Sequence, residues 1–351
     1  MIENDVKKEY APIDGDQEFV KLALQFAYGS DDLDYATTAA VQTLSGTGAC
    51  RIGGEFFARF LGRGHKIYLP NPTWGNHVKI FQDCGLDVQR YRYYNSETNG
   101  LDLEGMLEDL KNAPEGSVIL LHACAHNPTG CDPTLEQWKE ISQAVKDTNG
   151  VVFFDSAYQG FASGDAELDA AALRLFVSEG HKVALAQSFA KNFGLYGERC
   201  GTLSILTNSS QEKAAVMSQL KLIIRPMYSS PPIHGSGIVK TALGDDVLRT
   251  QYYAECAQMA HRIGSMRTLL VEKLKEAGSK HDWSHVTEQI GMFAFTGMSK
   301  EMVQKLTAEY SIFMTLDGRI SLAGLNDGNV EYVAKAVHSV TDGESISGKG
   351  S

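Results

Sequence analysis

The segment Ser188–Arg199, SFAKNFGLYGER, holds residue types that could do chemistry on a carbonyl compound. Lys191 follows the apolar run VALAQ, and an amine held at a strand end can form a Schiff base with an aldehyde. Arg199 and Ser188 accompany it, and a guanidinium beside a hydroxyl suits a phosphate dianion. A ligand with both an aldehyde and a phosphate is pyridoxal phosphate (PLP). A lone lysine after a buried strand is ordinarily only a surface residue, so this hypothesis depends on the rest of the chain.

A second candidate for binding the phosphate is the turn SGTG at 45–48, between an expected strand and an expected helix. Free N–H groups and the positive end of the helix dipole favour an anion there. A glycine turn alone more often only reverses the chain. It therefore supports a phosphate site only in combination with Lys191 and Arg199.

Three further segments could surround the ring of such a cofactor. Asp155 ends the buried run VVFFD, where a carboxylate could pair with a pyridinium nitrogen. Tyr158 and Asn127, the latter in HNPTG, could reach the ring oxygen, and Trp74 in PTWGNH could stack on the ring. Each residue also has an ordinary explanation, namely a helix cap, turn chemistry or core packing.

Two other sets of residues leave alternatives open. His122, Cys124 and His126 alternate like metal ligands on one face of an extended segment, but no further ligands accompany them, so we expect no metal. Arg225 and Arg319 could each grip a carboxylate with two hydrogen bonds. For either arginine alone, a solvated surface position is the simpler explanation.

The composition argues against several classes of protein. With 351 residues, 43% of them hydrophobic, the chain is long enough for a large core and for about two domains. The net charge of -11 argues against nucleic-acid binding, because no basic surface would neutralise phosphates. The six scattered cysteines indicate reduced intracellular thiols. No apolar run reaches the roughly 18 residues of a membrane helix, and the start lacks a signal-peptide core, so we expect a cytoplasmic protein that does not bind membranes.

Apolar runs alternate with amphipathic stretches along most of the chain, which predicts an α/β fold with a mostly parallel sheet. From about Tyr252 a long helical stretch leads into short strands and further helices. We predict a large domain over 1–257, a smaller α+β C-terminal domain over 258–342 and a disordered tail over 343–351. The expected strands cover 38–44, 66–70, 87–94, 117–123, 151–155, 183–188 and 201–206, and the expected helices include 48–61 and 134–148.

Taken together and in this order, the motifs resemble the aspartate aminotransferases, a subgroup of the PLP-dependent aminotransferases with the fold called type I. The resemblance runs from about Tyr10 to about Val340 and implies a large domain with a central sheet and a smaller C-terminal domain. The matching segments are SGTGA, PTWGNH, HACAHNPTG, FFDSAYQGFASG, SFAKNFGLYGER, RPMYSSPP and GRISLAGL.

The resemblance implies a role for each matched residue. Lys191 bonds to the PLP aldehyde and moves a proton, Asp155 pairs with the ring nitrogen, and Tyr158 contacts the ring oxygen as the third catalytic residue. Arg319 takes the α-carboxylate of the substrate, and Arg225 of the neighbouring subunit takes the distal carboxylate. Asn127 also contacts the ring oxygen and Trp74 stacks on the ring, and both border the substrate. Tyr10 reaches the phosphate bound to the partner subunit. The phosphate of the chain's own cofactor is held by Ser45, Gly46, Thr47, Ser188 and Arg199.

The implied protein is a homodimer with shared sites. It exchanges an amino group between L-aspartate and 2-oxoglutarate, giving oxaloacetate and L-glutamate. Two arginine clamps favour dicarboxylic amino acids and 2-oxo acids, because a charged hydrogen bond contributes about 1.5–3 kcal/mol. Two alternatives stay open. Relatives with the same arginines accept aromatic substrates, and the absence of the segment that the family carries before residues 7–15 could leave an impaired PLP-binding homologue.

Overall fold

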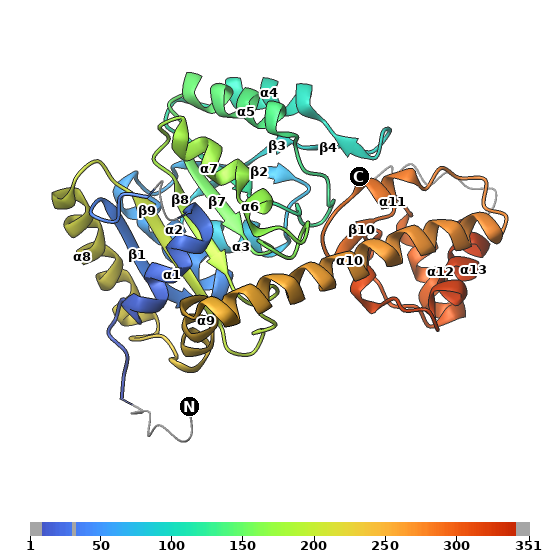
Figure 1. The fold of residues 1–351 in the computed structure, drawn as a ribbon. Coiled ribbons are helices and arrows are strands. Elements are labelled where there is room, and N and C mark those ends of the chain that lie inside the picture. The colour runs from blue at the N-terminus through green and yellow to red at the C-terminus, as the bar shows by residue number, and fades with distance from the viewer. Residues whose placement is uncertain (1–8, 30–32, 342–351) are drawn as a thin grey trace.

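A seven-stranded sheet forms the centre of the protein (Figure 1). The computed structural model describes residues 9–29 and 33–341, so the tail expected over 343–351 lies outside the described residues. The strands lie in the order β1-β9-β8-β7-β6-β2-β3. Their bounds are β1 (Thr38–Leu44), β2 (Lys66–Asn71), β3 (Asp87–Arg92), β6 (Val118–His122), β7 (Val151–Ser156), β8 (Ala184–Ser188) and β9 (Cys200–Leu206).

The expected α/β fold with a mostly parallel sheet is confirmed. Strands β3, β2, β6, β7 and β8 pair in parallel, whereas β9 is antiparallel to both β8 and β1. Two antiparallel steps restore the direction, so β1 runs the same way as β8. The stretch expected as one strand over 87–94 ends at Arg92, and a two-stranded hairpin of β4 (Tyr94–Asn95) and β5 (Gly100–Leu101) follows it.

Helices cover both faces of the sheet, which is why its strands are apolar on both sides. Each face has its own cluster of buried side chains. One cluster includes α1 (Gln17–Tyr28), α4 (Leu103–Lys111), α5 (Leu135–Asp147), α7 (Ala171–Ser178) and α9 (His234–Gly244), and α6 (Ala166–Asp169) lies just before α7. The other includes α2 (Ser45–Phe60), α3 (Asn76–Asp83) and α8 (Ser210–Met227).

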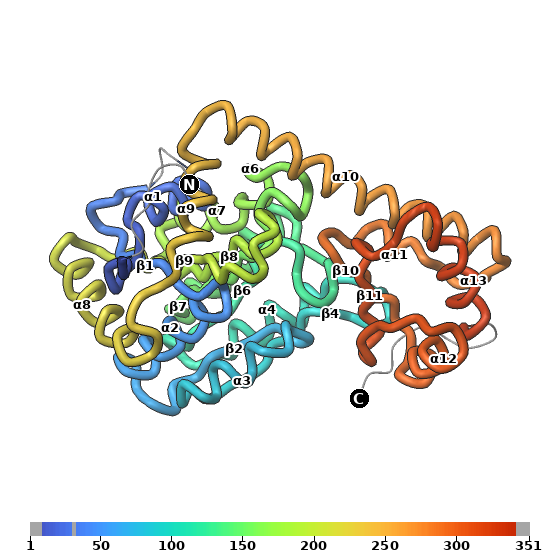
Figure 2. Tube along the Cα trace, turned by 90° about the horizontal axis from the view of Figure 1, so that it is seen from below, coloured from blue at the N-terminus to red at the C-terminus, as the bar shows by residue number. Residues whose placement is uncertain are grey.

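A long helix, α10 (Asp246–Glu276), runs from α9 beside the sheet to the C-terminal elements, as Figures 1 and 2 show. These elements share a third buried cluster with α10. They are α11 (Ser284–Glu288), β10 (Phe293–Phe295), α12 (Lys300–Tyr310), β11 (Arg319–Ser321), a 3-10 helix (Leu322–Gly324) and α13 (Val330–Thr341). The division at 257/258 falls inside α10 and stays a prediction. In the part of the chain that the structure describes, no helix is both long and apolar enough to cross a membrane.

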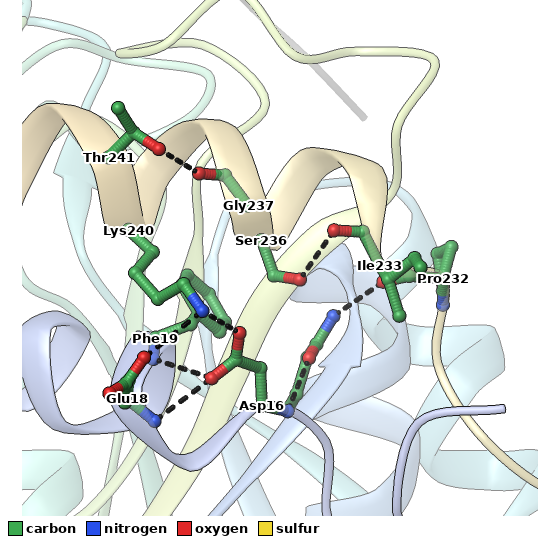
Figure 3. A network of polar contacts seen from close by, with 10 residues as sticks. Asp16, Glu18, Phe19, Pro232, Ile233, Ser236, Gly237, Lys240 and Thr241 are labelled. Atoms are coloured by element: carbon green, nitrogen blue, oxygen red, sulfur yellow. Dashed lines mark hydrogen bonds and ion pairs between the residues drawn. The ribbon is translucent and has the colours of Figure 1, made fainter. Parts of the chain in front are cut away.

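A polar network fastens the start of α1 to α9 and to β1 (Figure 3). The Asp16 carboxylate caps α1 by accepting from backbone N–H groups of its first turn, and it lies 2.7 Å from Lys240 Nζ on α9. The backbone N–H of Asp16 donates to Gln42 Oε1 on β1 at 3.0 Å, and Gln42 Nε2 donates to the Pro232 carbonyl at 2.8 Å. The strand that leads to Ser45 is therefore tied to both neighbouring segments.

The imidazoles of two buried histidines, His122 and His126, make no hydrogen bond to a carboxylate among the described residues. Burial and, to a smaller degree, the neighbouring His77 lower the pKa of His122 to about 3, and Asp155 only partly opposes them. Burial and the neighbouring His122 and His77 also hold the pKa of His126 well below its ordinary value. These imidazoles are therefore neutral in the folded protein at physiological pH.

We predict that the free energy of unfolding falls on acidification below about pH 6.5, the ordinary pKa of histidine. In the range down to the folded pKa of about 3, the unfolded chain binds a proton at His122 that the folded protein excludes. The slope should be roughly 1 kcal/mol per pH unit for this group. Urea unfolding of the wild type and of His122→Gln at pH 7 and pH 5 measures it. The variant should show the weaker pH dependence, and an equal dependence would contradict the prediction.

Close backbone packing at Gly201 gives a second prediction. A Cβ added there would overlap the carbonyl oxygen of Gln187 and lie 2.8 Å from the Cα of Ser45. Because these are backbone atoms, Gly201→Ala should lower the free energy of unfolding by about 1–3 kcal/mol. Gly264 in α10 is the matched control: a Cβ there meets nothing, so Gly264→Ala should raise stability by about 1 kcal/mol. If chemical denaturation showed equal changes in the free energy of unfolding for the two substitutions, the close backbone contact at Gly201 would not determine stability.

Candidate active site

A cavity of about 230 Å³ opens at the carboxyl end of the sheet. Most of the predicted site residues line it, together with residues that the sequence did not single out. The lining residues are Ser45, Gly46, Thr47, Trp74, His122, Cys124, Asn127, Asp155, Ala157, Tyr158, Ser188, Ala190, Lys191, Tyr196 and Arg199.

The direction of the strands explains why segments so far apart in sequence meet here. Strands β1, β2, β6, β7 and β8 all end at the same edge of the sheet, and in open α/β sheets ligands collect at that edge. Ser45 follows β1, Trp74 follows β2 and Asn127 follows β6. Asp155 is the last residue but one of β7, and Tyr158 follows that strand. Lys191 follows β8 by three residues.

The corner at Ser45 has the features of an anion site. The expected turn at 45–48 is the first turn of α2, because the helix begins at Ser45 and not at residue 48. No side chain caps this end, so its N–H groups are free for an anion. Ser45 Oγ lies 2.9 Å from Ser188 Oγ, and the Arg199 side chain borders the same cavity.

Lys191 is placed for nucleophilic chemistry. Its Nζ lies 5.4 Å from the centre of the Tyr158 ring. Burial lowers the pKa of the Lys191 amine, the Arg199 charge lowers it further, and Asp155 opposes both. A lowered pKa increases the fraction of neutral amine, which is the nucleophilic form.

Asp155 is a largely buried carboxylate, 12% exposed, that stays ionised. Burial raises its pKa, but the hydrogen bond from His77 and nearby positive charges, including that of Lys191, bring it below the ordinary value. His77 Nε2 lies 2.9 Å from Asp155 Oδ2. The alternative role as a helix cap does not apply, since this carboxylate pairs with His77 at the end of β7.

A chain of hydrogen bonds continues from His77 through Thr73 to His122, which also lines the cavity. The Asn127 backbone N–H donates to His122 Nδ1 at 3.2 Å, which leaves the proton of His122 on Nε2, facing Thr73 Oγ1 at 3.4 Å. Thr73 can then donate to His77 Nδ1 at 2.9 Å, and His77 keeps its proton on Nε2 for Asp155. The donors thus select one tautomer of each imidazole, and that order directs a proton toward Asp155.

The C-terminal part reaches the cavity through Arg319. Its Nη1 donates to Asn127 Oδ1 at 2.9 Å, and its guanidinium carbon lies 4.3 Å from the centre of the Phe293 ring. Arg319 itself does not line the cavity, but Asn127 does. This hydrogen bond joins β11 to the loop after β6 at the mouth of the site.

Two predicted residues lie away from the cavity of their own chain. Tyr10 is 91% exposed, and Arg225 is exposed in the last turn of α8, where its Nη1 donates to Ser229 Oγ at 2.8 Å. Neither residue lines the cavity. Their expected roles in a partner subunit stay predictions.

Sequence reasoning missed three contributors. Thr73 orders the two histidines, Tyr196 lines the cavity, and Asn192 is buried next to Lys191. Thr73 and Asn192 stand beside Trp74 and Lys191 in motifs already singled out, so proximity in sequence was the available signal. The direction of their side chains was not readable from the sequence.

The expectation of no metal stays a prediction. One atom each of Cys50, His77 and Asp155 lie within 4.8 Å of one another. His77 and Asp155 are already paired with each other by a hydrogen bond. His122 and His126 likewise have hydrogen-bond partners in the loop after β6.

Comparison with known proteins agrees with this geometry. The family model described as "Aminotransferase class I and II" matches residues 2–337. A protein of Dictyostelium discoideum named "Aspartate aminotransferase, mitochondrial" is 56% identical over 343 residues, covering 97% of this chain and 80% of that protein. The solved mitochondrial aspartate aminotransferase of Trypanosoma brucei is 47% identical with a TM-score of 0.93, over 96% of this chain and 89% of that one.

A third relative shows the cofactor. The aromatic-amino-acid aminotransferase of Burkholderia pseudomallei, solved covalently bound to pyridoxal phosphate, is 40% identical with a TM-score of 0.93. The match covers 97% of this chain and 85% of the Burkholderia chain. The chain described here therefore belongs to the class I and II aminotransferases, a family of PLP-dependent enzymes.

Proposed function

We propose that this enzyme is an aspartate aminotransferase, which transfers an amino group reversibly between L-aspartate and 2-oxoglutarate to give oxaloacetate and L-glutamate. The observation that carries the proposal is the shared cavity of Lys191 and Asp155, an amine of lowered pKa near a buried carboxylate. The names of the Dictyostelium and Trypanosoma relatives support the choice of aspartate.

The donor set of the cavity fits PLP. The uncapped start of α2 at Ser45–Thr47, with Ser188 and Arg199, would hold the phosphate, and Trp74 would lie against the ring. Asp155 would face the ring nitrogen, and Tyr158 and Asn127 the ring oxygen. When bound, PLP supplies an aldehyde that bonds to an amine and a ring that withdraws electrons from the substrate carbon.

The residues of the chain do the remaining work. Asp155, which His77 helps to keep ionised, would stabilise a positive charge on the ring nitrogen of PLP. Lys191 Nζ can attack a carbonyl as a neutral amine and afterwards move a proton inside the cavity. The Tyr158 hydroxyl stays protonated, because burial and Asp155 raise its pKa, so it can donate a hydrogen bond.

Substrate recognition would require two subunits. Arg319, held by Asn127, would take the α-carboxylate, and Arg225 of a partner would take the distal carboxylate. The exposure of Arg225 and Tyr10 supports a homodimer in which both reach the neighbouring site. Two arginine clamps would fix both ends of a dicarboxylate relative to Lys191.

Two alternatives are tested by the same experiments. An aromatic or broad-specificity aminotransferase is favoured by the name of the Burkholderia relative, and an impaired PLP-binding homologue would bind the cofactor without turnover. The cytoplasmic location stays a prediction, and the Dictyostelium relative is named mitochondrial.

Titration with substrates tests the reaction and its specificity. The purified enzyme with PLP should lose the absorption band of the lysine-bound cofactor on addition of L-aspartate and recover it with 2-oxoglutarate. Lys191→Ala should lack that band and turn over at least about 10⁴-fold more slowly, because it removes both the nucleophile and the proton carrier. Faster conversion with L-phenylalanine than with L-aspartate would support the broad-specificity alternative. Uptake of PLP without conversion of any substrate would support the impaired homologue.

Complementation tests the shared site. Lys191→Ala and Arg225→Ala should each be nearly inactive with aspartate. After unfolding and refolding together, they should regain about a quarter of wild-type activity, because half of the random dimers are mixed and each has one native site. The matched control mixes Lys191→Ala with Arg319→Ala, which restores the same activity only if Arg319 also acts across the interface. No recovery in the first mixture would place Arg225 outside the partner's site.

A further inference from the structure

One buried side chain joins the turn that carries Lys191 to the loop that carries Tyr158. Asn192 is 2% exposed, and its Nδ2 donates to the backbone carbonyl of Gln159 at 3.0 Å. Because Asn192 follows Lys191 and Gln159 follows Tyr158, this hydrogen bond joins the residues that directly follow the two catalytic residues.

The loop on the Tyr158 side is a fixed anchor. Three backbone N–H groups of this loop, those of residues 160, 162 and 163, donate to the buried Asp169 carboxylate at 2.8 to 3.1 Å. The Gln159 side chain donates to the carbonyls of Phe26 and Ala166. The carbonyl that receives Asn192 is therefore held from both sides.

The turn on the Lys191 side is held by backbone hydrogen bonds and by aromatic packing, including Phe193 on Tyr252 with ring centres 4.1 Å apart. The Gly194 N–H donates to the Lys191 carbonyl at 3.1 Å and closes the turn. Phe189 and Phe193 pack beside it, with ring centres 5.5 Å apart. No other hydrogen bond of a described side chain reaches from this turn to the loop at 158–163, so Asn192 is the polar link between them.

Packing alone does not explain an amide side chain at position 192. Asn192 Oδ1 is buried and has no hydrogen-bond partner among the described residues. An unpaired buried acceptor destabilises the protein, whereas an apolar side chain of similar size would avoid that cost. The amide is explained by the single bond that its Nδ2 makes.

We propose that Asn192 is a positioning residue, which holds the Lys191 amine at a fixed distance from Tyr158 and away from water by clasping the two loops together. The proposal rests on the proposed role of Lys191. Asn192 does not line the cavity, so it acts on the amine through the turn and makes no contact with substrate.

Titration of Lys191 in the PLP-free protein tests the role of the Asn192–Gln159 hydrogen bond without any turnover. In Asn192→Ala the freed turn should admit water to Lys191, and relief of its burial should raise the pKa of the amine toward the ordinary value of lysine. The pH dependence of acetylation of Lys191, read by mass spectrometry, gives this pKa. Gln289→Ala is the matched control: Gln289 is also 2% exposed and bonds backbone groups of Phe295 in the C-terminal part. It should leave the Lys191 pKa unchanged.

An isosteric variant separates the hydrogen bond from packing. In Asn192→Asp the introduced carboxyl can donate to the Gln159 carbonyl only when protonated, and burial raises its pKa. With PLP and aspartate, kcat should therefore fall about 10- to 100-fold at pH 9 and recover toward the wild type at pH 6, with KM for aspartate little changed.

Two results would overturn the proposal. One is that the Lys191 pKa is unchanged in Asn192→Ala, while the free energy of unfolding falls as much as it does in Gln289→Ala. The other is a constant ratio of variant to wild-type kcat from pH 6 to pH 9 for Asn192→Asp. The Lys191 pKa is read without turnover, and only the kcat ratio needs an active wild type. Failure of the proposed transamination would therefore appear separately, as a wild type that does not convert aspartate.

Discussion

The structure depends on keeping a carboxylate ionised in a place where burial opposes it. Asp155 is largely buried, and burial alone would raise its pKa. The hydrogen bond from His77 reverses that tendency, and His77 can donate only because Thr73 and His122 leave its proton on Nε2. The charge of Asp155 is therefore maintained by the hydrogen bond from His77, which Thr73 orients, together with nearby positive charges that include Lys191.

The same cavity requires backbones to approach more closely than side chains allow. A Cβ at Gly46 would lie 3.2 Å from Ser188 Cβ, and one at Gly53 would lie 2.7 Å from the Phe153 ring. These two glycines let α2 lie close against β7 and β8, so its first N–H groups reach the corner at Ser45. Small residues in this helix therefore set the position of the anion site relative to Asp155.

The sequence predicted the fold and the cavity well, for a physical reason. Buried parallel strands are continuous apolar runs, and their polar continuations, such as Asp155 and Lys191, meet at one edge of the sheet. The sequence did not predict that α2 begins at Ser45, because no capping side chain marks that end. It also did not predict the roles of Thr73 and Asn192, since the direction of a loop side chain depends on tertiary contacts that have no local pattern.

The chain divides its site between groups that it can position alone and groups that it cannot. Lys191, Asp155, Tyr158 and the start of α2 converge within one subunit, where strand direction and buried hydrogen bonds hold them. Among the residues that the structure describes, Arg225 has only a neighbouring serine hydroxyl as its side-chain partner. An exposed guanidinium keeps its hydration, and an ion pair with a carboxylate stabilises it little in water. The pair contributes more when both groups are shielded from solvent. The groups that would perform the chemistry are thus organised by the fold itself, whereas recognition of a second carboxylate would follow from assembly.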